Sequence, residues 1–169
     1  MRYTPKINNT KPLLITILLT VIAISDLLFA SQMLSLKWLF QLLFLCFATC
    51  AMQIFIKYVL TTYEYYLEEN TLYIYKILGK RKLCVANFVL SNIENKLEKL
   101  SDCKSNESEF SKKEILNYVR NMQFTDIYSL TYNLYGTRYL VKLETDENFA
   151  LLLNERIECA IREKDDDQI

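Results

Sequence analysis

The sequence predicts a membrane α-helical hairpin followed by an α+β soluble domain, in which a rolled antiparallel β-sheet is covered by a C-terminal amphipathic helix. Three observations lead to this fold class. Two long apolar runs, residues 13–30 and 36–60, lie a few residues apart near the N-terminus. After them, apolar and polar residues alternate in several short segments, as in half-buried strands. Finally, apolar residues recur every four positions from Phe149 to Ile161, which is typical of an amphipathic helix.

Each apolar run is long enough to cross a bilayer. A helix rises about 1.5 Å per residue, so roughly 20 apolar residues span the hydrocarbon core, and residues 13–30 lie near the lower end of that range. The single charge of this run is Asp26. It costs about 2.5–3.5 kcal/mol at a helix centre, which the many Leu, Ile, Val and Phe residues outweigh. Lys37 and Lys57 lie near the two ends of residues 36–60, where long side chains reach the interface.

Two other interpretations of these runs were weighed. Helices that are apolar all round also occur in the cores of large soluble proteins, but the rest of this chain is too small to bury two of them. The first run could instead be a signal peptide, with Arg2, Lys6 and Lys11 as its basic region and Ala30 at the cleavage site. The run is longer than the usual signal core, and Leu28 is bulky for the position two before cleavage.

Lysine and arginine residues near the helix ends predict the orientation. Only Lys37 lies beside the short connection between the two apolar runs. The other positive charges near the helices lie at the outer ends of the two runs or beyond them: Arg2, Lys6, Lys11, Lys57, Lys76, Lys80, Arg81 and Lys82. We therefore expect a multi-pass protein of the cell membrane with both termini in the cytoplasm and a short external turn at 31–35. The expected domains are the hairpin at 1–60, a cytoplasmic β domain at 61–163 and an acidic tail at 164–169.

Composition argues against several functional classes. The chain has 20 basic and 20 acidic residues, and this neutrality argues against a nucleic-acid-binding protein. It has no histidine, the commonest metal ligand and the usual general base at neutral pH. Its two glycines, Gly79 and Gly136, are too few for a phosphate-binding loop and instead mark turns. None of its five cysteines forms a CxxC pair. The sequence therefore predicts no enzyme, no cofactor and no metal site.

Alternation and turn residues predict the elements of the soluble domain in order. We expect strands at 61–67, 71–78 and 83–90, a solvated loop or short helix at 97–113, a weaker strand at 115–122, and a hairpin formed by 128–134 and 139–143. Tyr63, Tyr65 and Leu67 share one face of the first strand, because side chains alternate along a strand. Thr145 or Asp146 can cap the helix that follows.

This order of elements resembles the bacterial pleckstrin-homology-like membrane proteins. Residues 65–72, which read Tyr-Tyr-Leu-Glu-Glu-Asn-Thr-Leu, are similar to their first hairpin, and residues 90–93 to the segment that closes their third strand. Residues 139–143, leading through 145–147 into 149–153, are similar to their last strand and helix. The resemblance covers most of residues 13–163, but the segment 97–113 does not align, which leaves the strand count between 90 and 125 open. It implies a binding or scaffolding role and supplies no catalytic residues.

Two groups of residues are candidate sites. Lys76, Lys80, Arg81 and Lys82 surround the second predicted turn and could contact anionic lipids, although a solvated turn explains the same pattern. Asp26 and Gln41 are polar residues of the two apolar helices, and a hydrogen bond between them would fix helix packing. Asp26 could also be an ion site, because acidic residues within a membrane are often functional.

Three further patterns have ordinary structural explanations. Cys46 and Cys50 share a helical face and could bind a metal, but buried cysteine usually packs as a small apolar residue. Five tyrosines of the first two strands could line a peptide groove or simply pack on a sheet: Tyr63, Tyr65, Tyr66, Tyr73 and Tyr75. The acidic residues Glu68, Glu69 and 165–167 lack the spacing of a calcium loop.

The leading functional hypothesis is a membrane protein that presents a cytoplasmic interaction module to a protein partner or to lipids. An open sheet edge is the most accessible route for a peptide, by strand addition. The alternative is a subunit of an oligomeric transporter or channel that uses the Asp26-bearing hairpin, and an enzyme is the third hypothesis. The expected partners are membrane lipids, a protein whose identity the sequence does not give, and a second copy of the chain.

Overall fold

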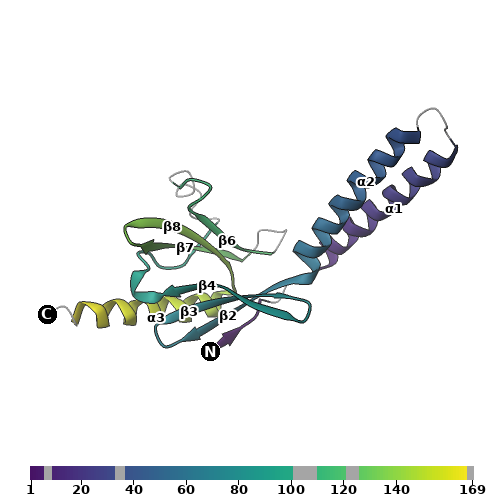
Figure 1. Ribbon diagram of the computed structural model, residues 1–169. Helices are drawn as coiled ribbons and strands as arrows, with labels where there is room; N and C mark the ends of the chain where they lie inside the picture. The colour runs from purple at the N-terminus through teal and green to yellow at the C-terminus, as the bar shows by residue number, and fades with distance from the viewer. Residues whose placement is uncertain (6–8, 33–36, 101–109, 121–125, 167–169) are drawn as a thin grey trace. The chain divides into compact units, whose positions relative to one another are not determined.

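The computed structural model describes residues 1–5, 9–32, 37–100, 110–120 and 126–166. The chain divides into two compact units (Figure 1). Ile7–Thr62 forms one, here called the helical hairpin unit; Met1–Lys6 together with Tyr63–Ile169 forms the other, here called the β-rich unit. The sequence assigned residues 1–60 to the hairpin, whereas the structure groups the first few residues with the strands.

The helical hairpin unit contains α1 (Thr10–Gln32) and α2 (Lys37–Ile54), which continues as the π-helix η2 (Phe55–Leu60). Two helices are therefore long and apolar enough to cross a membrane, as the sequence predicted. Within their apolar stretches only 11% and 6% of the residues are buried. Of the residues 31–35 at which an external turn was expected, Ser31 and Gln32 belong to α1, and residues 33–36 lie outside the described residues.

The first sheet of the β-rich unit has the strand order β1-β2-β3-β4. Its strands are β1 (Arg2–Tyr3), β2 (Thr61–Glu68), β3 (Thr71–Leu78) and β4 (Arg81–Val89). The expected strands at 61–67 and 71–78 are confirmed, with Leu72 and Ile74 fully buried. β1 was not predicted; it pairs antiparallel with β2, with Arg2 opposite Tyr66 and Tyr3 opposite Tyr65.

A bulge divides β4 into two parts. Ala86 lies opposite Ile74, but the next pair joins Cys84 to Tyr75, so Val85 is an additional residue in β4. A bulge bends the strand and re-aims the side chains beyond it. Phe88 lies in the core, whereas Leu83, on the other side of the bulge, is 60% exposed.

The second sheet has the strand order β5-β7-β8-β6. Its strands are β5 (Glu98–Lys99), β6 (Ile115–Tyr118), β7 (Ile127–Leu134) and β8 (Thr137–Glu144), and the 3-10 turn η3 (Leu90–Asn92) follows β4. The predicted β7–β8 hairpin is confirmed, with Leu130 opposite Val141. β6 instead pairs parallel with β8, so the prediction of antiparallel strands throughout is wrong here. Sequence alternation does not report strand direction, which depends on how the chain returns.

The C-terminal helix α3 spans Glu147–Asp166 and continues past the expected boundary at residue 163. Asp146 provides the cap, because its Oδ1 accepts a hydrogen bond from the Phe149 amide at 2.8 Å. The predicted apolar face is buried at Phe149, Leu153, Ile157 and Ala160. The two sheets and this helix confirm the α+β layout of the soluble part.

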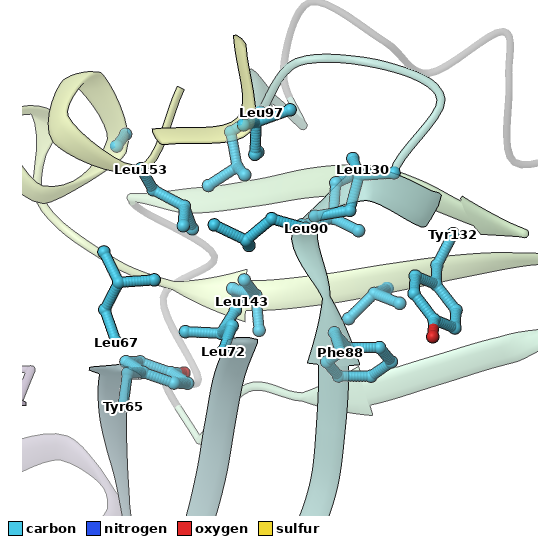
Figure 2. Packing of buried hydrophobic residues seen from close by; sticks show 14 of the residues in the cluster. Tyr65, Leu67, Leu72, Phe88, Leu90, Leu97, Leu130, Tyr132, Leu143 and Leu153 are labelled. Atoms are coloured by element: carbon cyan, nitrogen blue, oxygen red, sulfur yellow. The ribbon is translucent and has the colours of Figure 1, made fainter. Parts of the chain in front are cut away.

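The core of the β-rich unit forms where both sheets and α3 meet (Figure 2). Tyr65 and Leu72 come from the first sheet, Leu130 and Leu143 from the second, and Leu153 from α3. The Tyr65 hydroxyl also joins the sheets, because it donates to the Tyr118 carbonyl at 3.2 Å and accepts from the Glu144 amide at 3.1 Å. Burial raises the pKa of Tyr65 far above its ordinary value, so this hydroxyl keeps its proton at every physiological pH.

Candidate functional site

The four basic residues predicted to act together lie on two faces of the β3–β4 hairpin. Lys76 is opposite Leu83 and Leu78 is opposite Arg81, on the face that continues the core side. Lys80 occupies the turn itself and is exposed. Lys82 alternates to the other face. The segment 76–83 is here called the hairpin tip. One face of it carries Lys76, Leu78, Arg81 and Leu83, with Lys80 in the turn, whereas the Lys82 side chain lies on the opposite face.

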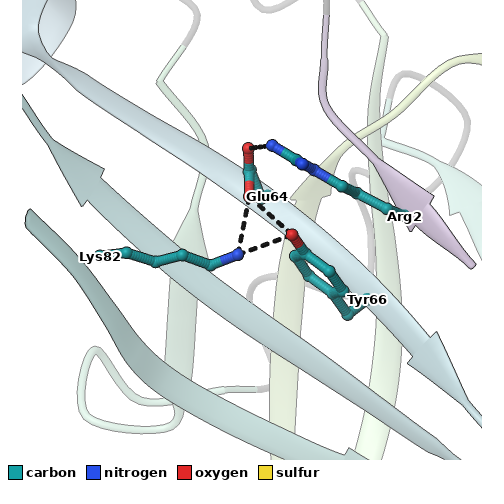
Figure 3. Close-up of polar contacts among 4 residues, drawn as sticks. All are labelled: Arg2, Glu64, Tyr66 and Lys82. Atoms are coloured by element: carbon teal, nitrogen blue, oxygen red, sulfur yellow. Dashed lines mark hydrogen bonds and ion pairs between the residues drawn. The ribbon is translucent and has the colours of Figure 1, made fainter. Parts of the chain in front are cut away.

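Lys82 is part of a polar cluster on the outer face of the first sheet, here called the Glu64 cluster: Arg2, Glu64, Tyr66 and Lys82 (Figure 3). Glu64 is 4% exposed and pairs with both Arg2 and Lys82, the latter at 3.0 Å. The Lys82 ammonium donates to the Tyr66 hydroxyl at 2.6 Å, and that hydroxyl donates to Glu64 at 3.2 Å. The cluster connects β1, β2 and β4 across the outer face.

The Glu64 cluster is charged at neutral pH. Burial raises the pKa of Glu64, but the hydrogen bonds from Arg2 and Lys82 outweigh it and hold the pKa below its ordinary value. The hydrogen bond to Tyr66 and the pairing with Glu64 raise the pKa of Lys82. The sequence did not predict this cluster, because Glu64 alternates away from the apolar face of its strand, as a solvated residue would.

Lys82 also lies between two tyrosine rings. Its ammonium is 4.0 Å from the centroid of the Tyr66 ring and 4.4 Å from that of Tyr75. The two rings meet edge to face with centroids 5.1 Å apart. Cations are attracted to aromatic faces at such distances. This arrangement occupies the lysine within the protein, so Lys82 is less available to a lipid headgroup than its neighbours in sequence.

The five tyrosines of β2 and β3 do not form one groove. Tyr65 is fully buried in the core, and Tyr63 is partly buried on the same face. Tyr66 alternates to the outer face, where Tyr75 packs against it. Tyr73 is on the Tyr75 side of β3, since side chains two residues apart share a face. The hypothesis of a single tyrosine-lined peptide groove is therefore wrong.

β4 forms one edge of the first sheet in the described part of the chain. The Leu90 amide donates to the Asn70 carbonyl at 2.8 Å, toward the β3 side. Because amides alternate in direction along a strand, those of Asn87 and Val89 point away from β3. An edge of this kind presents backbone donors and acceptors to another strand. Val89 has φ −76° and ψ 123°, an extended conformation suited to pairing.

The polar residues of the helices are not joined as expected. Asp26 is partly buried, and its Oδ2 is buried without a hydrogen-bond partner in the described part of the chain. Gln41 is exposed on α2, so no hydrogen bond joins it to this oxygen. Cys46 and Cys50 are exposed free thiols on α2.

Two of the acidic candidates are exposed. Glu68 and Glu69 are exposed at the end of β2, while Asp165 and Asp166 belong to α3 and Asp167 lies outside the described residues. Within the described ranges, no group of three or more Cys, Asp or Glu side chains is placed to hold a metal ion.

No protein-family model, curated protein or solved structure matches this chain. A functional proposal must therefore rest on the residues and geometry of the chain itself. The resemblance to pleckstrin-homology-like proteins stays a prediction from the residues. Two surfaces of the β-rich unit offer interaction chemistry: the backbone edge of β4, and the basic and apolar hairpin tip.

Proposed function

We propose that this protein is a membrane-anchored, non-catalytic interaction module, in which a pleckstrin-homology-like domain binds an extended segment of a protein partner at the β4 edge. The observation that carries the proposal is the exposure of many large apolar side chains along α1 and α2. Leu14, Leu18 and Leu28 illustrate it, with 60%, 60% and 62% of their surface accessible. Apolar surface costs about 25 cal/mol per Å² in water, so helices of this kind belong in a bilayer.

The pairing of β1 with β2 supports a two-pass arrangement. β1 precedes α1 in the chain, and β2 follows α2. Two strands pair only in the same compartment, so this pairing supports two crossings of the membrane by the helices between them. Cleavage after the first apolar run would remove β1 and its pairing with Tyr65 and Tyr66, which argues against a signal peptide. The basic flanking residues favour the cytoplasm for this compartment.

The layered architecture supports the pleckstrin-homology-like assignment. Two sheets pack around one core, and a C-terminal helix, α3, covers it through Leu153 and Ile157. The β2–β3 hairpin and the β8–α3 connection occur where the resemblance expects them. The parallel β6–β8 pair and the added strand β1 are departures particular to this chain. Domains of this layout typically bind partners on exposed edges and loops, not in a catalytic cleft.

The β4 edge suits an extended peptide. Strand addition supplies affinity from main-chain hydrogen bonds, while exposed side chains such as Val85 and Val89 select apolar neighbours. Anchoring in the membrane raises the effective concentration of a weak site for a partner at the same surface, without further contacts. A protein partner near the membrane is therefore the favoured occupant of this edge.

Site-specific photocrosslinking in intact membranes tests the proposal. A photoreactive amino acid replaces the exposed Asn87 in the full-length protein, and a matched control replaces the exposed Leu151 of α3. We expect a discrete adduct from position 87 and none from position 151. Val89→Pro in the position-87 protein should abolish the adduct, because it removes an outward backbone donor at a φ that proline accepts.

Val89→Ala is the matched control, since it shortens the same side chain and keeps the amide. Its adduct should persist. No adduct at position 87, or one that Val89→Pro leaves unchanged, would contradict strand addition at this edge.

The unpartnered Oδ2 of Asp26 supports a second candidate, a subunit of an oligomeric transporter or channel. A buried carboxyl oxygen without a hydrogen bond is costly in an apolar environment and is frequently functional in membranes. Two helices enclose no pore, so transport requires several copies. Ion flux into proteoliposomes that is lost in Asp26→Asn would favour this candidate; equal flux from both proteins, or none, would reject it.

A further inference from the structure

We propose that the hairpin tip, residues 76–83, docks on an anionic lipid surface, with Leu78 and Leu83 entering the interface and Lys80 and Arg81 contacting headgroup phosphates. The proposal rests on the membrane anchoring described above and adds a second contact of the β-rich unit with the bilayer. It is independent of the protein that occupies the β4 edge.

Exposed leucines distinguish this part of the hairpin from the core-forming part. Leu78 is 40% exposed. It is paired with Arg81, and Arg81 is two residues from Leu83 on the same strand, so Leu78 and Leu83 share a face of the hairpin. The bulge at Val85 separates them from Phe88, which is in the core. The strands thus continue beyond the core and present apolar side chains that stay partly exposed in the described part of the β-rich unit.

The charge of the hairpin fits an anionic partner. Residues 71–89 include four basic residues and no acidic one. Glu64 engages Lys82 on the outer face, which leaves Lys76, Lys80 and Arg81 as the positive charges around the leucines. Each basic residue near an anionic leaflet shifts a docking equilibrium roughly fivefold, within a Debye length of the surface.

The hairpin tip lies at the end of the first sheet where β2 begins. β2 and β3 are neighbouring strands joined by a two-residue turn, so the last residue of β3 lies at the same end of the sheet as the first residue of β2. Leu60, the last residue of η2, precedes Tyr63 by three residues, which span at most about 10 Å. The tip is thus at the same end of the sheet as Thr61, the first residue of β2, which directly follows η2 in the chain.

The β7–β8 turn shows that exposed apolar residues alone do not define such a surface. Leu134 is 39% exposed and Tyr135 is 99% exposed, in the turn completed by Gly136. The nearest charged groups are of both signs, since Arg138 pairs with Glu94 at 2.7 Å. This turn therefore lacks the single-sign charge that favours an anionic surface, and it serves as an internal control.

Fluorescence quenching of the full-length protein in lipid nanodiscs tests the inference. Leu83→Cys is labelled with an environment-sensitive fluorophore in a background whose native cysteines are replaced by serine, and Leu134→Cys is the matched control. Discs contain either phosphatidylcholine alone or phosphatidylcholine with phosphatidylglycerol, each with a nitroxide lipid as quencher. We expect lipid quenching at position 83 in the anionic discs, less in the neutral ones, and a decline with salt. Position 134 should show none.

Removing the charges should release the tip. Lys80→Ala with Arg81→Ala should lower the ratio of docked to undocked tip roughly thirtyfold. Circular dichroism identifies a variant that has failed to fold, and Lys80→Arg, which keeps the charge, should quench as the parent does.

A label at position 83 that aqueous iodide quenches in every disc, and nitroxide lipid in none, would overturn the proposal. Protection that requires added protein would overturn it equally and identify the tip as a protein contact. Carbonate extraction separates this result from a failure of the proposed function: a protein that stays in the discs without tip quenching refutes only the docking, whereas a protein released by carbonate refutes the anchoring.

Discussion

Leucine side chains meet opposite surroundings in the two units of this chain. In the β-rich unit, Leu72, Leu90 and Leu153 are 0% exposed and pack between two sheets and a helix. In α1, Leu14, Leu18 and Leu28 are about 60% exposed, and a buried position is occupied by the small residue Ala23. Small residues let helix backbones approach closely without any apolar driving force. The chain itself shields the apolar residues of one unit, whereas those of the other stay exposed on two helices that are long and apolar enough to cross a membrane.

The largest effect should come from the β-rich core. Leu153→Ala removes a fully buried side chain from α3 and leaves a cavity between the sheets, which should lower the free energy of unfolding by about 2–5 kcal/mol. Leu151→Ala, on the exposed face of the same helix at 58% exposure, should change it by less than about 0.5 kcal/mol. Chemical unfolding of the full-length protein in detergent, followed by near-ultraviolet circular dichroism, measures both. Equal losses would show that α3 does not cover the core as described.

A charge in the apolar helix should act on insertion instead of folding. Val21 is exposed near the middle of α1, and Val21→Arg should make insertion less favourable by about 3 kcal/mol. Leu151→Arg adds the same charge to the β-rich unit and should leave insertion unchanged. The fraction that resists carbonate extraction from membranes reports the difference. If Val21→Arg were extracted no more than the parent protein, the helix would not face lipid at this position.

The smallest effect concerns the Glu64 cluster. The pKa of Glu64 is below its ordinary value in the folded protein, so the unfolded chain binds more protons between the two values. Its contribution is present above the ordinary carboxyl pKa and is lost as pH falls through the lower, folded one. Glu64→Gln should lower the free energy of unfolding by about 1 kcal/mol at neutral pH. This loss is small for a buried carboxylate, because its partners Arg2 and Lys82 are partly exposed to solvent.

Unfolding free energies measured across acidic pH provide the test. The variant should lose the acid-dependent decline that Glu64 causes, and Glu68→Gln, an exposed neighbour on the same strand, should keep it. Identical pH profiles for the parent and Glu64→Gln would contradict the lowered pKa.

Residue patterns predicted the parts of this fold that repeat over several positions. The alternation around Leu72 and Ile74 and the four-residue period from Phe149 to Ile161 each persist long enough to identify a strand and a helix. β1 was missed because two residues, Arg2 and Tyr3, are too few for any pattern. The parallel direction of β6 depends on tertiary packing that alternation does not encode.

Local sequence patterns likewise identified only some residues of the candidate sites. The basic residues 76–82 could be found from composition, but their separation onto two faces required the register and the bulge at Val85. Glu64 was missed because a polar residue on the solvent side of a strand gives no sign that Arg2 and Lys82 will cover it. Long-range pairs of this kind join residues far apart in sequence, where local patterns contain no information.

The pairing of β1 with β2 has a consequence for biosynthesis. Arg2 and Tyr3 leave the ribosome before α1, whereas their partners Tyr65 and Tyr66 leave it after α2. The first strand to be made must therefore wait, unpaired, until the whole helical segment between the two strands has been synthesised. The first sheet can be completed only after that point, because β1 lacks its partner until Tyr65 and Tyr66 have emerged.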